Sequence, residues 1–329
     1  MIGARYVSWR AKLMLNVTII LPVYNEEALF PFLPTTILKW RKNWEENHPG
    51  RKIFLLVIND GSTDNTWQHC LNWAQQSSAM TFINLGRNFG HQAALSAGLD
   101  CCDGNHIVCI MDADLQDPLQ ATEELIQKID EGHDVAYGVR SIRDGETWFK
   151  KKTAMVFYWL MKQANPWLPR DSGDFCALSP KAVTTLRKLR ETHRFMRGMR
   201  AWIGLKQIPV TYHRVARLQG ETHYGLLKML KFAWDAILSF SPWPLRLISL
   251  TGITIAGIGA AYGLYAITQK FLIGNTVQGW TSLIIILCII GGTQLIALGL
   301  IGEYIARIYE ESKGRPLYTV ESIVNSESN

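Results

Sequence analysis

The pair of carboxylates in Asp112-Ala113-Asp114 is the sharpest chemical signal in the chain. It follows an apolar, β-rich run at 107–111, and if the strand continues through it, its two-residue period puts both carboxylates on one side. Adjacent negative charges are costly unless a cation lies beside them. Hard oxygen ligands suit Mg²⁺ or Mn²⁺, and Mg²⁺ usually shares its site with substrate phosphates. The spacing therefore favours a divalent metal and a nucleoside diphosphate; the alternative is a surface turn at Asp112 and a plain helix start at Asp117-Pro118.

Polar residues also follow three earlier strand-like runs. Any one of these segments alone is ordinary turn chemistry, since Asp60-Gly61 makes a good turn and Asp64 can cap the next helix. Four of them, including the one after 107–111, indicate a binding site if they meet at one edge of a sheet. The three segments are Pro22-Val23-Tyr24-Asn25-Glu26-Glu27, Asn59-Asp60-Gly61-Ser62-Thr63-Asp64 and Gly86-Arg87-Asn88-Phe89-Gly90-His91-Gln92.

The elements that must position these residues alternate between strand and helix. This alternation predicts an α/β fold with a doubly wound, mostly parallel sheet. In such a sheet ligands bind beyond the carboxyl ends of the strands, where the polar segments are expected to lie. The predicted strands are 17–21, 53–58, 81–85, 107–111 and 134–139, and the helical stretches between them include 64–76 and 92–101.

Two stretches near the C-terminus, 247–268 and 280–302, carry no Asp, Glu, Lys or Arg. Each is longer than the about 20 apolar residues that span a bilayer core of roughly 30 Å. They predict a transmembrane hairpin, because two core helices of a soluble protein, the alternative, would usually show a polar stripe. Small residues in both stretches favour close helix packing, within the hairpin or between subunits. Glu303 is expected to pair with Arg307 one turn further on.

Basic residues flank the hairpin but are scarce in its connection, so the positive-inside rule places the large domain and both termini in the cytoplasm, at the inner (plasma) membrane. No cleavable signal peptide is expected, because the basic segment 1–16 has no apolar core. Lys228, Lys231 and Arg246 precede the hairpin, Arg307, Lys313 and Arg315 follow it, and Lys270 lies in the connection. The predicted domains are 1–16, a cytoplasmic domain at 17–223, a juxtamembrane helix at 224–244, the hairpin at 245–303 and a tail at 304–329.

The composition agrees with a soluble domain joined to a membrane hairpin. The chain has 329 residues, of which 48% are hydrophobic, and a net charge of +6. This modest basic excess, next to a hairpin, favours anionic lipid or a phosphorylated substrate over nucleic acid. The six cysteines show no CxxC spacing, which predicts reduced thiols and no zinc site.

Jointly, the motifs resemble those of the family 2 glycosyltransferases, which have the GT-A fold. The chain is most similar to the polyprenyl-phosphate glycosyltransferases, in particular the bacterial bactoprenol (undecaprenyl-phosphate) glucosyltransferases, with dolichol-phosphate mannose synthases as more distant relatives. The resemblance covers nearly the whole chain and rests on the polar segments at 22–26, 59–62, 87–90 and 112–118, together with Gly173-Asp174-Phe175 and Gly302-Glu303-Tyr304-Ile305.

The resemblance implies a role for each matching residue. Asp174 is expected near the reacting centre on the acceptor side, as an orienting group or as a base, and Arg140 is expected to meet a phosphate. Asp114 and Gln116 would hold Mg²⁺ or Mn²⁺. The nucleotide-sugar would be bound by Pro22, Tyr24 and Glu26, which line the nucleotide pocket, by Asp60 at the base, by Asp112 at the ribose, and by Arg87 and Asn88.

The lipid phosphate is expected to meet basic residues at the membrane surface. Segments 150–163 and 224–244 mix lysines with aromatic residues, which predicts interfacial amphipathic helices, although the first could be an ordinary solvated face. Cys176 and His223 stand where relatives commonly carry arginine and lysine, so each removes a fixed positive charge. The weak candidates for the acceptor phosphate are Lys150, Lys151, Arg217 and His223.

The implied activity is inverting transfer of a hexose, with glucose from UDP-glucose favoured, to undecaprenyl phosphate for glycan, lipopolysaccharide or O-antigen modification. A lipid phosphate is already an anion, so the main chemical need is to stabilise the departing diphosphate. The expected partners are the bilayer, further copies of the chain in a homo-oligomer, a separate flippase and a downstream glycosyltransferase, but no nucleic acid. The alternatives are another sugar or GDP-mannose, a non-catalytic scaffold that binds nucleotide-sugar or lipid, and a processive polysaccharide synthase, whose Gln-x-x-Arg-Trp motif is not visible.

Overall fold

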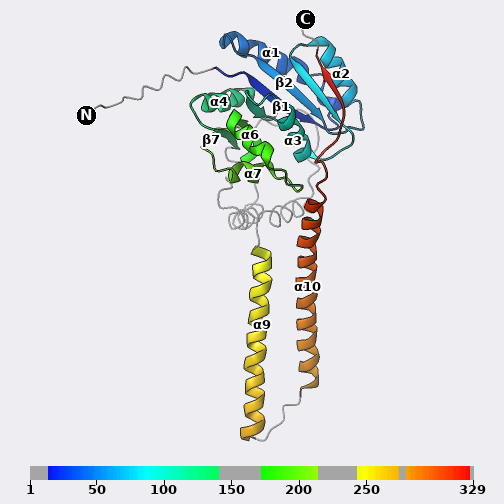
Figure 1. Ribbon diagram of the computed structural model, residues 1–329, viewed down its shortest axis with the longest axis vertical. Helices are drawn as coiled ribbons and strands as arrows, with labels where there is room; N and C mark the ends of the chain where they lie inside the picture. The colour runs from blue at the N-terminus through cyan, green and yellow to red at the C-terminus, as the bar shows by residue number, and fades with distance from the viewer. Residues whose placement is uncertain (1–13, 141–171, 214–242, 274–278, 327–329) are drawn as a thin grey trace, which may run out of the picture. The chain divides into compact units, whose positions relative to one another are not determined.

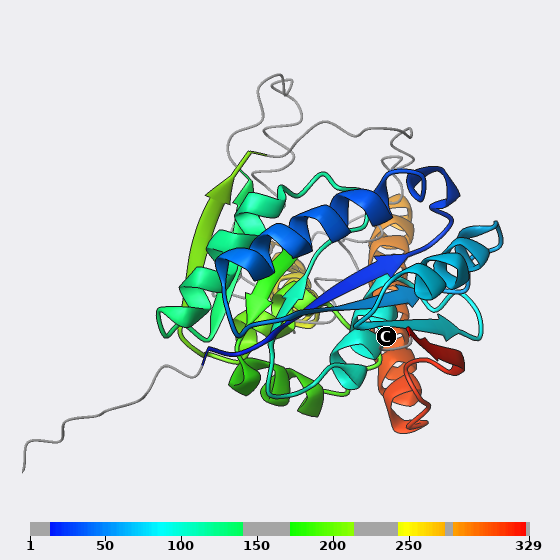
Figure 2. The same ribbon diagram turned by 90° about the horizontal axis from the view of Figure 1, so that it is seen from above.

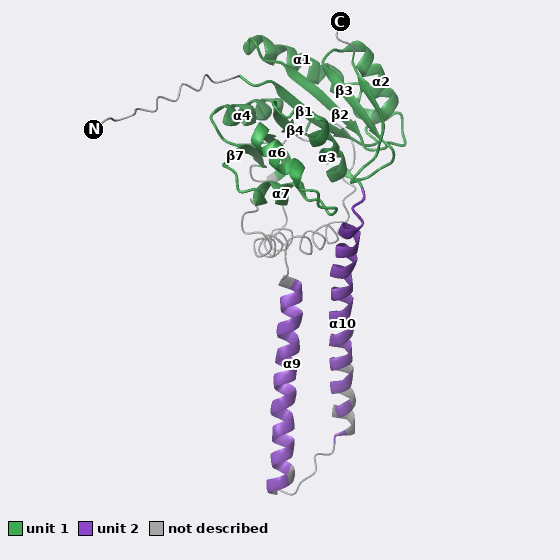
Figure 3. Ribbon diagram, in the orientation of Figure 1, with its two compact units in different colours: residues 1–152, 167–223, 316–329 green, residues 153–166, 224–315 purple. Residues whose placement is uncertain are grey.

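The computed structural model describes residues 14–140, 172–213, 243–273 and 279–326 (Figure 1). They belong to two compact units, which Figure 3 distinguishes by colour. So far as its residues are described, unit 1 comprises 1–152, 167–223 and 316–329, and unit 2 comprises 153–166 and 224–315.

An eight-stranded sheet forms the centre of unit 1, in the order β7-β5-β6-β4-β1-β2-β3-β8. The first four strands run parallel to one another, as the alternating pattern predicts. Three strands were not predicted: β6 lies antiparallel between β4 and β5, β7 lies parallel beside β5, and β8 lies antiparallel beside β3. The strands are β1 (Val17–Val23), β2 (Ile53–Asn59), β3 (Met80–Leu85), β4 (Ile107–Ile110), β5 (Val135–Arg140), β6 (Ser172–Leu178), β7 (Gln207–Tyr212) and β8 (Val320–Asn325).

Helices cover both faces of this sheet (Figure 2). The central strands are therefore buried on both sides, which explains why β1 and β2 read as nearly continuous apolar runs. One face packs against α1 (Leu33–Asn47), α2 (Thr66–Gln76) and α4 (Leu119–Asp130), and the other packs against α3 (His91–Cys101), α6 (Pro180–Lys188) and α7 (Met196–Trp202). A short 3₁₀ helix, η1 (Glu27–Leu29), precedes α1.

The direction of β6 determines which residues meet at the edge of the sheet. Because β6 is antiparallel to β4, its first residues lie where β4 ends. Ile110 pairs with Cys176, so Asp112 and Asp174, each two residues further toward that edge, come to lie across from one another. The first residues of β6 and the carboxyl ends of the parallel strands therefore lie at the same edge of the sheet and can contribute to one site.

Unit 2 contains two long apolar helices, α9 (Trp243–Thr268) and α10 (Trp280–Ser312), with a π-helical turn, η2 (Gln269–Ile273), after α9. The helix segments Pro244–Thr268 and Ile289–Ser312 are long and apolar enough to cross a membrane, and no part of their most apolar windows is buried within the structure. This exposure contradicts the alternative of two soluble core helices, which would be buried. The predicted Glu303–Arg307 pair is confirmed, with 3.3 Å between Oε1 and Nε.

The segment predicted as a C-terminal tail at 304–329 is largely ordered structure. α10 continues to Ser312, and β8 then adds a strand to the edge of the sheet at β3. Asn84 Nδ2 donates to Glu321 Oε2 at 2.8 Å, and the Gly86 amide donates to the Thr319 carbonyl at 2.9 Å. The chain therefore leaves unit 1 before α9 and rejoins it after α10.

Deleting residues 316–329 is expected to destabilise unit 1 by on the order of 3 kcal/mol, because several backbone hydrogen bonds of about 0.5–1.5 kcal/mol each are lost. The deletion also exposes the edge of β3, which promotes aggregation. Thermal unfolding and light scattering of the purified protein measure both effects. Deleting only 327–329, which follow β8, is the control; equal unfolding temperatures for the two deletions would contradict a stabilising role for β8.

Candidate functional site

The segments after β1 and β2 are tied to one another by side-chain-to-backbone hydrogen bonds. Asn25, whose φ of 52° is left-handed, accepts from the Thr63 amide at 2.8 Å through Oδ1. The Glu26 amide donates to Thr66 Oγ1 at 2.9 Å. Asp64 accepts from the amide of Thr66 at 3.0 Å, but the N-cap of α2 is Asn65, so Asp64 lies one residue before the capping position that was predicted for it. These bonds fix the shape of two of the four predicted polar segments.

The residues predicted to line the nucleotide pocket differ in their exposure. Pro22 is buried within β1, and Glu26 is partly buried. Tyr24 leaves 44% of its surface exposed directly after β1. In the segment after β3, Arg87 and Asn88 are exposed, and the Arg87 guanidinium lies over the Phe89 ring at 4.1 Å. An exposed tyrosine and an exposed arginine are thus available to a ligand at this edge.

Asp60 is buried, with 3% of its surface exposed, and its carboxylate holds the segment after β3. It accepts from the Phe89 amide at 2.8 Å, the Gly90 amide at 3.0 Å and Asn88 Nδ2 at 3.2 Å. Burial raises the pKa of Asp60, although the bonds from Phe89 and Gly90 oppose this. In this structure Asp60 fixes the position of Asn88 and its neighbours; its recognition of a base stays a prediction.

Gly61 also holds these two segments together, because its backbone lies against Arg87. A Cβ at position 61 would overlap the Arg87 carbonyl carbon and lie 2.5 Å from the Asn88 amide nitrogen, and the φ of +63° is itself unfavourable for other residues. We therefore expect Gly61→Ala to cost about 2–4 kcal/mol of stability, from left-handed strain plus overpacking.

Thermal unfolding and nucleotide-sugar binding by calorimetry measure the effect of Gly61→Ala. Gly132→Ala is the matched control, because Gly132 has a φ of +98° but nothing within 4 Å of its added Cβ. The control thus carries the backbone strain without the clash. A loss of stability no larger than that of Gly132→Ala would show that the segment after β3 shifts at little cost to make room for the added methyl group.

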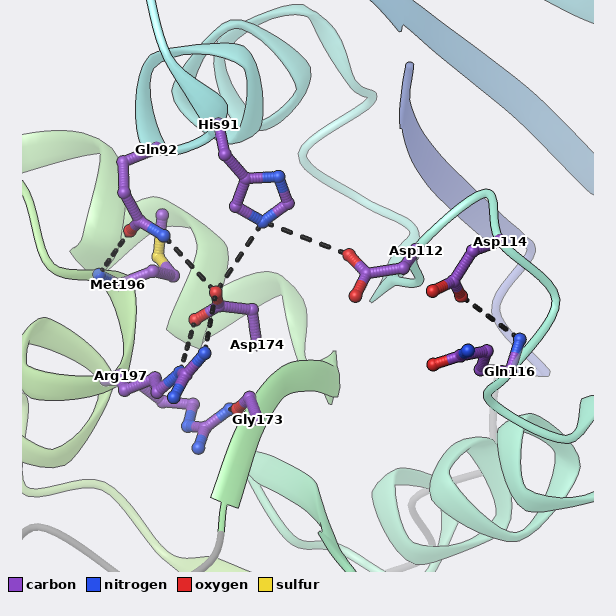
Figure 4. A network of polar contacts seen from close by, with 10 residues as sticks. His91, Gln92, Asp112, Asp114, Gln116, Gly173, Asp174, Met196 and Arg197 are labelled. Carbon is purple, nitrogen blue, oxygen red and sulfur yellow. Dashed lines mark hydrogen bonds and ion pairs between the residues drawn. The ribbon is translucent and has the colours of Figure 1, made fainter. Parts of the chain in front are cut away.

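The loop after β4 carries the predicted metal ligands. The strand does not continue through Asp112 and Asp114, because β4 ends at Ile110 and Leu115 adopts a left-handed φ of 54°. A left-handed conformation is uncommon for a leucine and marks a tightly constrained turn. The Gln116 amide donates to Asp114 Oδ1 at 3.1 Å, and Figure 4 shows the side chains of Asp114 and Gln116 extending from the same loop.

The chemistry of this donor set fits a divalent metal. Asp114 and Gln116 offer a carboxylate and an amide oxygen, the hard ligands that Mg²⁺ and Mn²⁺ prefer. Gln116 is buried, with 7% of its surface exposed, which restrains its side chain. Within the described part of the chain, no three His, Cys, Asp or Glu side chains cluster as a closed metal site. Two protein oxygens would leave other coordination positions to phosphate and water.

Arg140 lies close to the start of β6. It is the last residue of β5, opposite Tyr212 of β7, and its charge acts on the Tyr212 hydroxyl. The Tyr212 hydroxyl donates to Asp117 Oδ1 at 2.7 Å, and burial, then the Asp117 charge, raises the pKa of Tyr212 to about 12. A Cβ at Gly173 would lie 3.7 Å from Arg140 Nη2, so this guanidinium neighbours the residue before Asp174.

The Asp117-Pro118 pair begins a helix, as the alternative to a metal-binding segment predicts. Pro118 is the N-cap of α4, and Asp117 is buried with 2% of its surface exposed. One loop therefore contains both the start of α4 and the predicted metal ligands, and the two interpretations are compatible.

Asp174 is the most densely engaged carboxylate of the site (Figure 4). Arg197 Nε donates to Oδ1 at 3.1 Å, Gln92 Nε2 donates to Oδ2 at 3.2 Å, and His91 Nε2 lies 3.6 Å from Oδ2. Burial alone would raise the pKa of Asp174, but the contacts from His91 and Arg197 hold it well below its usual range. Asp174 is therefore an ionised carboxylate with partners on both oxygens.

Sequence reasoning did not assign His91, Gln92 or Arg197 to the site. The signal for the first two was present, because both belong to the polar segment after β3. Gln92 also accepts from the Met196 amide at 2.7 Å, which fixes the start of α7 and so the position of Arg197. Nothing in the local sequence of α7 indicates that Arg197 faces Asp174.

Cys176, at the position where the family resemblance predicts an arginine, is fully buried in β6. The charge of the Arg200 guanidinium acts on its thiol, and Arg200, which is fully buried, donates to the Gly173 carbonyl at 3.3 Å. The guanidinium of Arg200, which belongs to α7, therefore places a fixed positive charge beside Cys176. The weak acceptor-phosphate candidates and the predicted interfacial helices lie outside the described residues, apart from the first two residues of α9: Lys150, Lys151, Arg217, His223, 150–163 and 224–244.

Comparison with known proteins connects both units to one family. Residues 18–186 match the family model "Glycosyl transferase family 2", and residues 243–308 match "GtrB C-terminal hairpin". The sequence is 42% identical to an uncharacterized glycosyltransferase, YkcC, of Bacillus subtilis, over 92% of this chain and 93% of that protein. It is 34% identical to a prophage bactoprenol glucosyl transferase homolog of Escherichia coli, and 35% identical to the bactoprenol glucosyl transferase of Shigella phage SfX, each over 94% of this chain and 99% of the relative.

Among solved structures, glucosyl-3-phosphoglycerate synthase of Mycobacterium tuberculosis aligns with a TM-score of 0.46 and 19% identity, over 69% of this chain and 80% of that one. The sheet order, the helices on both of its faces and the two apolar C-terminal helices agree with the predicted fold class. This chain is therefore a membrane-associated, GT-A-like glycosyltransferase that belongs to glycosyl transferase family 2.

Proposed function

We propose that this enzyme transfers a hexose, with glucose from UDP-glucose the favoured donor, to undecaprenyl phosphate and inverts the anomeric carbon. The proposal draws on relatives named bactoprenol glucosyl transferase that align over most of the chain. The single observation that carries it is the meeting of the Asp112–Gln116 loop, on the expected donor side, with Asp174, on the expected acceptor side, at one edge of the sheet.

On the donor side, the proposed roles follow the positions of the side chains. Tyr24 and Arg87 are exposed where a nucleotide-sugar can reach them, and Asp112 follows β4, which neighbours the strand before Tyr24 in the sheet. Asp114 and Gln116 hold the metal; a bound Mg²⁺ or Mn²⁺ supplies positive charge to the departing diphosphate. Arg140 adds a fixed positive charge at the same edge, and fixed charge aimed at the leaving group stabilises the transition state.

On the acceptor side, the lipid phosphate attacks as an anion, so no residue has to remove a proton from it. Asp174 is ionised and already engaged by Arg197, Gln92 and His91, which suits an orienting carboxylate better than a general base. Arg197 is held by Asp174 with 33% of its side-chain surface exposed, so it can face a phosphate. Holding both substrates in line supplies the proximity contribution to the rate.

The proposed location is the inner membrane, with residues 17–223 and both termini in the cytoplasm. Because β8 pairs with β3, the segments before α9 and after α10 belong to the same unit, which requires an even number of membrane crossings between them. The basic residues that flank the hairpin favour the cytoplasmic side. A separate flippase would then move the lipid-linked sugar across the membrane, and a downstream glycosyltransferase would use it for lipopolysaccharide or O-antigen modification. The enzyme would act as a homo-oligomer.

The test is transfer of labelled sugar to an organic-extractable product by the detergent-purified protein. The reaction contains undecaprenyl phosphate, Mg²⁺ and one of several donors, including UDP-glucose and GDP-mannose, and NMR of the product reports the anomeric configuration. We expect label in the lipid phase from UDP-glucose, dependent on the lipid phosphate and removed by EDTA. Binding of nucleotide-sugar without transfer from any donor would contradict the proposal and favour a scaffold.

A further inference from the structure

His91 occupies the space between the two halves of the site. It is the first residue of α3, directly after the segment that Asp60 holds. Its Nε2 lies 3.6 Å from Asp174 Oδ2 and 3.9 Å from Asp112 Oδ1 (Figure 4). One imidazole nitrogen thus faces two carboxylates, one from the end of β4 and one from the start of β6.

The distances show that charge, rather than hydrogen-bond geometry, dominates this contact. Normal N–H···O bonds measure about 2.7–3.2 Å, so both separations are longer than a good hydrogen bond but within the range of an ion pair. A carboxylate pair without a cation between its members is unfavourable. A positive charge at this nitrogen therefore interacts with Asp112 and Asp174 at the same time.

The charged groups that face His91 favour its protonated form. Burial would lower the pKa of His91, but Asp174 and Asp112 together raise it above its usual value, and Arg197 opposes them only in part. Asp60 also interacts electrostatically with His91. A raised pKa extends to higher pH the range in which the imidazolium, the form that both carboxylates attract, is present.

We propose that His91 is a positioning residue for sugar transfer, whose imidazolium holds the donor-side Asp112 and the acceptor-side Asp174 in a fixed relation. This inference rests on the proposed function, because it assigns the two carboxylates to the two substrates. His91 acts through these aspartates. The backbone pairing of β4 with β6 brings the two aspartates to one edge of the sheet, and the charge on His91 Nε2 holds their side chains relative to one another beyond the last paired residues.

The proposal predicts that a different cation can replace His91 and a neutral group cannot. In the transfer assay we expect His91→Gln to lower kcat by about 10- to 100-fold, in the range of a lost charged interaction, with a smaller change in KM for UDP-glucose. His91→Lys should recover most of the rate. The control is His133→Gln, because His133 precedes β5 at the opposite edge of the sheet, where its Nδ1 contacts the Lys128 carbonyl at 3.0 Å.

The pH dependence separates positioning by charge from simple packing. The active form is protonated, so the kcat of the unmodified enzyme should fall as the pH rises above neutrality through the raised pKa of His91. His91→Lys should keep its rate to a higher pH, because a lysine stays charged there. This profile is measured on the unmodified protein, so it does not depend on the folding of a variant.

Two results would overturn the proposal: a rate for His91→Gln equal to that of the unmodified enzyme, or a kcat that stays flat between pH 7 and about pH 9, beyond the ordinary range of histidine titration. Equal losses in His91→Gln and His91→Lys would also overturn it, since the charge would then not matter. An unmodified enzyme that transfers no sugar from any donor would instead overturn the proposed function on which the inference rests.

Discussion

Asp114→Ala is expected to reduce sugar transfer by about 1,000-fold or more. Loss of the carboxylate leaves the Gln116 amide as the only predicted metal ligand in the loop, and removing one group that stabilises transition-state charge typically costs about 10²–10³-fold in kcat. Oriented positive charge on the diphosphate is lost together with the ligand, which increases the effect. Single-turnover transfer from labelled UDP-glucose, at increasing Mn²⁺ concentration, measures the loss.

Asp103→Ala is the matched control for this prediction. Asp103 lies before β4, at the sheet edge away from the site, with 51% of its side-chain surface exposed, so its removal should leave the rate unchanged. A variant Asp114→Ala that keeps a metal-dependent rate near that of the unmodified enzyme would remove Asp114 from the metal site. Partial recovery at high Mn²⁺ concentration would instead indicate weakened binding of the metal, as the assignment predicts.

Asp174→Ala is expected to abolish transfer and to destabilise the protein by about 1–3 kcal/mol, the range for hydrogen bonds to charged groups. Arg197 and His91 keep 33% and 43% of their side-chain surfaces exposed, so solvent screens part of the charge that the lost carboxylate leaves uncompensated. Arg197 and His91 would then face one another without the carboxylate between them. Thermal unfolding in detergent measures the stability, and the transfer assay measures the activity.

The difference in stability between the unmodified protein and Asp174→Ala should decrease both at low pH and at high pH. The pKa of Asp174 is lowered by folding, so its contribution is present above its unfolded value near pH 4 and is lost as the pH falls further. The pKa of His91 is raised by folding, so its contribution is present below about pH 6.5 and is lost as the pH rises through the folded value. We therefore expect the largest difference between about pH 4.5 and 6.5.

Glu131→Gln is the control for the stability measurement. It removes an exposed ion pair with Lys128, at 2.9 Å, and exposed pairs contribute about 0–1 kcal/mol. If Asp174→Ala lowers the free energy of unfolding no more than Glu131→Gln does, the network around Asp174 does not stabilise the fold. The role of Asp174 would then be limited to contacts with the substrates.

The alternating pattern was sufficient to predict β1 to β5 and the polar segments beyond them, because local apolar runs and turn residues determine both. It could not predict that Asp174 meets Asp112. Their proximity depends on β6 pairing antiparallel with β4, a contact between distant parts of the chain, and only the resemblance to a family placed Asp174 at the site. The left-handed Leu115 was equally invisible, because leucine gives no signal for that conformation.

The cations of the site were harder to predict than its carboxylates. Aspartates in turns stand out in a sequence, whereas Arg197 lies on a short helix among other basic residues and faces the site only because Gln92 fixes the start of α7. The length of α10 had no comparable signal: the absence of charge predicts a membrane span at 280–302, and the helix continues beyond that span through charged residues to Ser312.

The place of β8 in the sheet has a consequence for how the protein is made. The ribosome synthesises β8 only after both α9 and α10, so β3 keeps an unpaired edge throughout the insertion of the hairpin. On the proposed topology, in which α9 and α10 cross the bilayer, a second helix that failed to insert would leave β8 on the far side, where it could not reach β3. Completion of the sheet therefore follows correct insertion, and quality-control proteases that recognise exposed strand edges could distinguish chains that inserted properly from those that did not.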